Sequence, residues 1–132
     1  MEAITPSDKI YVKDSKIPTG GRGVFARRDI RKGEHIEKCP YIDIPSYEIE
    51  HITQSFLVTY IFFYGEDKSR LLLVLGFGSI YNHSHHPNAR YQIREDESVI
   101  DFIATLDIKK DEEITFDYKS GNPHSKSPLW FE

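Results

Sequence analysis

The chain has 132 residues, of which 39% are hydrophobic, with one cysteine and a formal net charge of −4 at pH 7. This composition suits one domain with a hydrophobic core, excludes an intrachain disulfide and a cysteine-rich zinc site, and argues against a nonspecific grip on nucleic acid. The apolar stretches are too short to span a membrane and residues 1–8 lack the regions of a signal peptide, so we expect a soluble intracellular domain that binds no membrane.

Short apolar-rich and alternating stretches predict a mainly β chain. The best helix candidate is Ser46–Phe56, which Ser46 would cap. Two hairpins are expected, one around the turn at residues 65–69 and one around the acidic turn after Arg94. The predicted strands are Lys9–Lys13, Gly23–Arg27, Glu34–Cys39, Leu57–Tyr64, Arg70–Leu75, Asn88–Arg94 and Val99–Leu106.

One stretch of the chain is repeated. Residues 26–36 resemble residues 104–114, because Ala, Asp, Ile, Lys, Glu and Ile recur in register. Each copy reads as strand, tight turn and strand, with Lys32-Gly33 or Lys110-Asp111 in the turn. We interpret the repeat as two similar turns with similar roles, and duplication is the alternative.

Three glycines lie around Arg22, in the order Gly20-Gly21-Arg22-Gly23. Glycine lets the backbone approach a ligand closely or adopt a positive φ. Taken alone, the stretch is typical of a plain turn. It does not match a dinucleotide-binding fingerprint, because it does not open a helix after a strand.

The stretch Tyr81–Asn88 reads Tyr-Asn-His-Ser-His-His-Pro-Asn and follows an apolar run. These residue types favour a turn, and loops commonly carry functional side chains, although a surface turn with coincidental histidines is the alternative. Histidine is a common metal ligand. Adjacent histidines usually point in different directions, however, and no acidic or cysteine partner has a recognisable spacing, so we predict no metal site.

Taken in order, these stretches resemble the SET domain, the fold of lysine methyltransferases, over Ile10 to Tyr118. The chain is especially similar to the minimal stand-alone SET proteins of large DNA viruses and some bacteria. It departs from the family at Asp111, where glycine is usual, and it lacks the three cysteines that bind zinc after the final tyrosine in many relatives. The matching stretches are Gly21-Arg22-Gly23-Val24-Phe25-Ala26, Asp29-Ile30-Arg31-Lys32-Gly33-Glu34, Asn82-His83-Ser84-His85-His86-Pro87-Asn88 and Asp111-Glu112-Glu113-Ile114-Thr115-Phe116-Asp117-Tyr118.

The resemblance implies a mainly β, β-clip-like fold of several small sheets with a knot-like C-terminal core, in which residues 82–88 lie against the C-terminal strand. One SET domain would span residues 1–132, with a short tail at residues 119–132 in place of the zinc-binding region. The minimal relatives pair into homodimers, so a homodimer is expected here.

The resemblance also implies a protein-lysine N-methyltransferase that uses S-adenosylmethionine and acts on a protein substrate such as a histone tail. A catalytically silent SET-like module that binds peptides is one alternative, and an unrelated small β protein with a histidine-rich metal turn is another. Tyr118 matches the catalytic tyrosine, and Tyr91 and Phe116 would line the lysine channel. The expected cofactor-binding residues are Gly21, Arg22, Gly23, Asn82, His83, Tyr118 and Trp130, the last by stacking.

Overall fold

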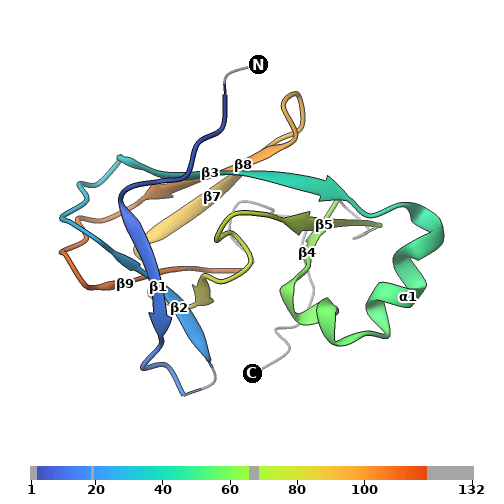
Figure 1. Cartoon of the computed structure of the whole chain (residues 1–132), viewed down its shortest axis with the longest axis horizontal. Helices are drawn as coiled ribbons and strands as arrows, with labels where there is room; N and C mark the ends of the chain where they lie inside the picture. The colour runs from blue at the N-terminus through green and yellow to red at the C-terminus, as the bar shows by residue number, and fades with distance from the viewer. Residues whose placement is uncertain (1–2, 19, 66–68, 119–132) are drawn as a thin grey trace.

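The computed structural model describes residues 3–18, 20–65 and 69–118 as a mainly β fold (Figure 1). Within these residues one sheet has the strand order β1-β2-β9-β6 and another has the order β4-β5-β3-β8-β7. The strands are β1 (Ile10–Asp14), β2 (Arg22–Ala26), β3 (His35–Asp43), β4 (Phe62–Tyr64), β5 (Arg70–Val74), β6 (Asn82–His83), β7 (Ala89–Arg94), β8 (Val99–Ala104) and β9 (Glu113–Phe116). The helical elements are η1 (Ser46–Glu48), α1 (Ile49–Thr53) and η2 (Phe56–Tyr60).

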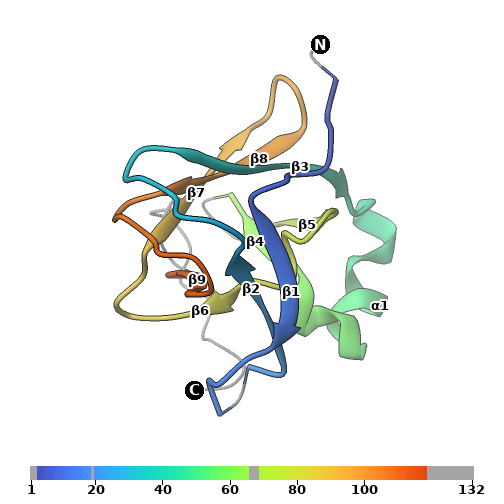
Figure 2. The same cartoon turned by 60° about the vertical axis from the view of Figure 1, so that its left-hand side comes forward.

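The four-stranded sheet brings the motif at residues 82–88 next to the C-terminal motif at residues 111–118 (Figure 2). β6 runs parallel to β9, with Asn82 opposite Thr115 and His83 opposite Phe116. The side chain of Asn88 bonds to the same strand, because its Nδ2 donates to the Glu113 carbonyl and its Oδ1 accepts from the Thr115 N–H, both at 2.9 Å. The prediction that residues 82–88 lie against the C-terminal strand is confirmed.

Aromatic side chains fill the core between the sheets. Phe116 is 2% exposed, and its ring centroid lies 5.5 Å from that of Phe102 and 5.3 Å from that of Tyr91. The Tyr81 ring stacks on Phe102 at 4.4 Å, and its hydroxyl donates to the buried Glu37 carboxylate at 2.8 Å. The polar group of a buried tyrosine thus has the partner that burial requires.

The segment between β3 and β5 differs from its prediction. The helix α1 covers only Ile49–Thr53, and its N-cap is Glu48 rather than the predicted Ser46. The predicted strand Leu57–Tyr64 is wrong in its first half, which forms η2, and only Phe62–Tyr64 is a strand. The Ser55 hydroxyl accepts from the Leu57 N–H at 3.2 Å, a local bond that favours a turn over a sheet ladder. In Figure 1 this segment lies at one end of the molecule.

The two repeated turns bond to each other. Ile30 and Ile108 exchange both of their backbone hydrogen bonds at 2.7 Å. Gly33 and Asp111 occupy the same place in their turns, and both have positive φ, at 87° and 72°. Reciprocal bonds flank this pair: Gly33 N–H to Ala104 O at 2.8 Å, Asp111 N–H to Ala26 O at 2.7 Å, Lys32 N–H to Asp107 Oδ1 at 2.8 Å and Lys110 N–H to Asp29 Oδ1 at 2.8 Å.

The helices of the described residues are short. The longest helical elements, α1 and η2, have five residues each. In this part of the chain no helix is long and apolar enough to cross a membrane.

Candidate active site

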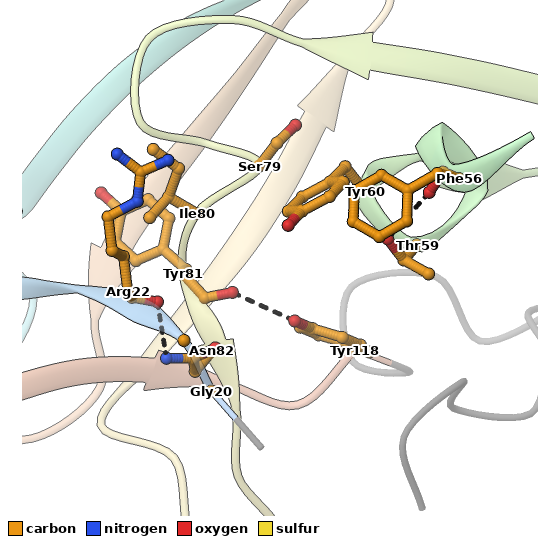
Figure 3. Close-up of a pocket in the computed structure, with 11 residues that line it drawn as sticks. Gly20, Arg22, Phe56, Thr59, Tyr60, Ser79, Ile80, Tyr81, Asn82 and Tyr118 are labelled. Atoms are coloured by element: carbon orange, nitrogen blue, oxygen red, sulfur yellow. Dashed lines mark hydrogen bonds between the residues drawn. The ribbon is translucent and has the colours of Figure 1, made fainter. Parts of the chain in front are cut away.

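A cavity of about 280 Å³ lies where β2, β6 and the end of β9 face η2 (Figure 3). This volume is just below the usual range for small-molecule pockets, which is about 300–1,000 Å³. Backbone from the glycine turn forms one side of the cavity, and aromatic rings from η2 form the other. The lining residues are Gly20, Gly21, Arg22, Phe56, Thr59, Tyr60, Ser79, Ile80, Tyr81, Asn82 and Tyr118.

Four of the residues predicted to bind the cofactor line this cavity: Gly21, Arg22, Asn82 and Tyr118. Gly23 is buried in β2 beside it, and His83 is buried behind Tyr118. Trp130, which was predicted to stack on the cofactor, lies outside the described residues.

The amide of Asn82 has a defined orientation. Its Nδ2 donates to the Arg22 carbonyl at 3.1 Å and to Glu113 Oε2 at 2.8 Å, and the residue is 8% exposed. An amide nitrogen has two hydrogens, so both are used by these bonds. The amide oxygen is left as the group that can accept a hydrogen bond from a ligand.

Tyr118 is held at two points. Its hydroxyl donates to the Tyr81 carbonyl at 3.1 Å, as Figure 3 shows, and its backbone N–H donates to His83 Nδ1 at 3.1 Å. Burial raises the pKa of Tyr118 to about 12, with a smaller contribution from Tyr60. The hydroxyl is therefore neutral, and remains a donor, at physiological pH.

Tyr91 and Phe116 both contact Tyr118. The Phe116 and Tyr118 ring centroids are 5.1 Å apart, and the Tyr91 hydroxyl donates to the Tyr118 carbonyl at 3.3 Å. Burial raises the pKa of Tyr91, so this hydroxyl is also neutral. The two predicted substrate residues thus belong to the same aromatic cluster as the predicted catalytic residue.

The bond from the Tyr118 N–H constrains the tautomer of His83, which lies next to this cluster. Because the Tyr118 N–H donates to His83 Nδ1, neutral His83 carries its proton on Nε2, which lies 3.5 Å from Nε2 of His85. Among the described residues, no group of three or more His, Cys, Asp or Glu is arranged to hold a metal. The absence of a metal stays a prediction.

Several residues of the site were not predicted from sequence. Phe56, Thr59 and Tyr60 line the cavity from η2, a segment that was expected to be partly strand. Glu113 was also missed as a partner of Asn82. Gly23 is the one sequence signal for this role of Glu113, because a glycine leaves space for the Glu113 carboxylate. That signal can be interpreted only once β2 is known to pair with β9.

Comparison with known proteins identifies the family. Residues 21–119 match the SET-domain family model. A Schizosaccharomyces pombe histone-lysine N-methyltransferase specific for H3 lysine-37 is 34% identical over 113 residues, which is 85% of this chain and 71% of the relative. The crystal structure of a Plasmodium falciparum protein proposed to be a histone methyltransferase is 35% identical, with a TM-score of 0.70, and the match covers 98% of this chain and all of the other.

A larger assembly contains the same fold. The Chaetomium thermophilum polycomb repressive complex 2, in an autoinhibited conformation bound to S-adenosylmethionine, is 25% identical with a TM-score of 0.69. The match covers 90% of this chain but 16% of that one. The predicted resemblance and the mainly β fold are thus confirmed. The chain belongs to the SET-domain family and is a protein-lysine N-methyltransferase that uses S-adenosylmethionine.

Proposed function

We propose that this chain methylates lysine side chains of a histone, with the cofactor in the cavity of Figure 3 and Tyr118 at the reacting atoms. The observation that carries the proposal is the convergence of three features on one cavity: the glycine turn, the Asn82 amide and the Tyr118 hydroxyl. The histone-specific name of the Schizosaccharomyces pombe relative supports the choice of substrate.

The residues of the cavity fit S-adenosylmethionine. When bound, this cofactor supplies a methyl group that is activated by a positively charged sulfur. The Asn82 amide oxygen and the carbonyl-rich backbone around Arg22 and Tyr81 offer acceptors to a ligand with cationic groups. His83 acts through its backbone in β6 and through its bond to the Tyr118 N–H.

The chemistry asks mainly for alignment, because methyl transfer is an in-line displacement on a neutral amine. Tyr118 serves that need, since its hydroxyl is fixed by the Tyr81 carbonyl and is neutral. With cofactor and substrate bound, the hydroxyl would orient the amine, and its oxygen would accept weak carbon–hydrogen contacts from the methyl group. Desolvation among the aromatic rings lowers the pKa of the incoming lysine and so favours its nucleophilic form.

The residue at position 116 bears on how many methyl groups the enzyme adds to one lysine, and here it is phenylalanine. In the family, phenylalanine at this position leaves room for a second or third methyl, whereas tyrosine there holds a water that blocks the space. Tyr91 is the other residue that could limit the reaction. Because its hydroxyl donates to the Tyr118 carbonyl, we propose that it does not block the channel and that the enzyme adds more than one methyl.

We also propose that a single SET domain spans residues 1–132, that Trp130 stacks over the cofactor in place of a zinc-binding region, and that the protein forms a homodimer. Exposed Phe56 and Tyr60 at the cavity, 77% and 43% accessible, support an aromatic partner there. Loss of cofactor affinity in Trp130→Ala would test the stacking, and light scattering would test the dimer.

One experiment tests the whole proposal. The protein is incubated with labelled S-adenosylmethionine and a panel of histones and lysine-rich proteins, with the Tyr118→Phe protein as control. We expect methyl-lysine on a histone with the unmutated protein only, read by mass spectrometry. Labelling of only non-histone proteins would overturn the histone assignment. Cofactor binding without any transfer would favour the silent peptide-binding module.

A further inference from the structure

Glu113 joins three segments beside the cavity. It lies in β9 opposite Phe25 of β2. Its Oε2 accepts from Asn82 Nδ2 at 2.8 Å, and its Oε1 accepts from the Ser15 hydroxyl at 2.6 Å. The carboxylate therefore has one oxygen on the Asn82 amide and the other on a residue that follows β1.

The side chains of Glu113, Asn82 and Ser15 explain why residues 20 and 23 are glycines. A Cβ atom at Gly23 would lie 2.3 Å from Glu113 Oε2, which is closer than real contacts allow. A Cβ atom at Gly20 would lie 2.8 Å from Asn82 Nδ2 and 2.9 Å from Ser15 Oγ. The glycines thus make room for the Glu113, Asn82 and Ser15 side chains, so the segments that carry them are built around the carboxylate.

The carboxylate also decides which way the Asn82 amide faces. The two ends of an amide have nearly the same shape, but an ionised carboxylate can only accept hydrogen bonds. Glu113 and the Arg22 carbonyl are both acceptors, so they select the nitrogen end of the amide. The oxygen end is then the one presented to a ligand.

We infer that Glu113, held by Ser15, is a positioning residue that fixes the Asn82 amide so that its oxygen receives the ammonium group of the cofactor's amino-acid part. This inference rests on the proposed cofactor site. The ammonium is the donor that fits, because the two groups bonded to the Asn82 amide are acceptors and one of them is a carboxylate, which favours a cation over a neutral donor.

Two ligands separate positioning from general stability. S-adenosylhomocysteine has the amino-acid part, and 5′-methylthioadenosine lacks it. Calorimetry on the full chain should show that Glu113→Ala weakens binding of the first by about tenfold and changes binding of the second by less than about twofold. A general loss of structure would weaken both ligands alike, and that result would overturn the inference.

Conservative variants sharpen the test. In Glu113→Gln the new amide oxygen can still accept from Asn82 while the new NH₂ meets the Ser15 oxygen, so this variant should recover most of the affinity lost in Glu113→Ala. Ser15→Ala should cost about two- to threefold, because it removes only the bond that steadies the carboxylate. If Glu113→Ala does not fold, Glu113→Gln combined with Ser15→Ala takes its place, since the introduced amide then has no fixed orientation.

A double-mutant cycle distinguishes failure of this inference from failure of the proposed cofactor site. If Glu113 acts through Asn82, then Glu113→Ala should cost little further affinity for S-adenosylhomocysteine in the Asn82→Ala background. Full additivity of the two losses, or a loss in Asn82→Ala with none in Glu113→Ala, would overturn the inference alone. No loss in Asn82→Ala would overturn the proposed cofactor site and the inference with it.

Discussion

The two sides of the cavity are built in different ways. On the strand side, the polar groups of Asn82 and Tyr118 bond to segments that lie 31, 37 and 60 residues away in the sequence. On the η2 side, the Thr59 hydroxyl donates to the carbonyl of Phe56 in the same turn at 3.1 Å, and Phe56 is 77% exposed.

This difference separates two tasks. Groups fixed by long-range bonds keep one geometry before a ligand arrives, which suits hydrogen bonding and chemistry. Exposed aromatics on a short, locally bonded helix supply apolar area and can adjust to what they cover. Matched substitutions on the two sides should therefore have unequal effects.

The largest contrast is expected between two tyrosines. Tyr118→Phe removes the fixed hydroxyl and should lower kcat by about 10²–10³-fold, the usual loss for a preorganised hydrogen-bonding group at the reacting atoms, while cofactor affinity changes little. Tyr60→Phe, on the η2 side, should change kcat by less than about threefold. Steady-state methylation assays measure both. Near-normal turnover of Tyr118→Phe would remove this residue from the catalytic role.

Cofactor affinity should show the next contrast. Asn82→Ala leaves polar cofactor atoms without a partner, so it should cost about 1–3 kcal/mol, or about 5–150-fold in Kd. Thr59→Ala removes a hydroxyl that bonds within its own turn and should cost less than about threefold. Titration calorimetry with S-adenosylhomocysteine provides both values. Equal losses in the two proteins would erase the distinction between the two sides.

Residues on the strand side should also control how many methyl groups the product lysine carries. Phe116→Tyr should shift products toward monomethyl-lysine by roughly tenfold in ratio, because a new hydroxyl brings polar atoms into the space of the later methyl groups. Tyr91→Phe should shift them toward higher methylation. Mass spectra at long reaction times measure the ratios. If the unmutated protein yields monomethyl-lysine alone, the bound Tyr91 hydroxyl is the limiting group.

A smaller effect is expected on stability at high pH. The pKa of Tyr118 rises from 10.0 to about 12 on folding, chiefly through burial, so the folded state favours the neutral form. That stabilisation is complete below pH 10 and is lost as the pH rises toward 12. Between pH 9 and pH 11 the unmutated protein should lose about 1 kcal/mol more of its unfolding free energy than Tyr118→Phe does. Urea denaturation at both pH values compares them, and parallel losses would contradict the assignment.

No effect at all is expected from a chelator. The protein has one cysteine, and the proton on neutral His83 Nε2 points toward His85, so this pair does not offer two free lone pairs. Turnover and Tm should be unchanged after dialysis against a chelator. Stoichiometric zinc in the purified protein would revive the metal hypothesis.

The strands were predictable where side-chain alternation and turns agree. The hairpin of β7 and β8 and the position of β5 follow from such local patterns. The cavity residues Gly21, Asn82 and Tyr118 were expected because their stretches, in this order, resemble the motifs of the SET domain, and all three line the cavity. Their residue types alone would have predicted ordinary turns.

The η2 side could not be predicted in the same way. Its apolar residues read as a strand, but only Val58 is buried, so no buried face selects an extended backbone. Glu113 was missed for another reason. Its partners Asn82 and Ser15 are 31 and 98 residues away, and only the pairing of β2, β9 and β6 brings them together.

The reciprocal turns around Ile30 and Ile108 have a consequence for the kinetics of folding. Their flanking bonds close loops of 75 and 81 residues, and such distant pairings are slow to form. During synthesis, the edge of β2 has no partner until residues 104–116 have left the ribosome. The cavity is therefore completed only when β9 pairs with β2, and the rate at which cofactor binding appears during refolding would report on that pairing step.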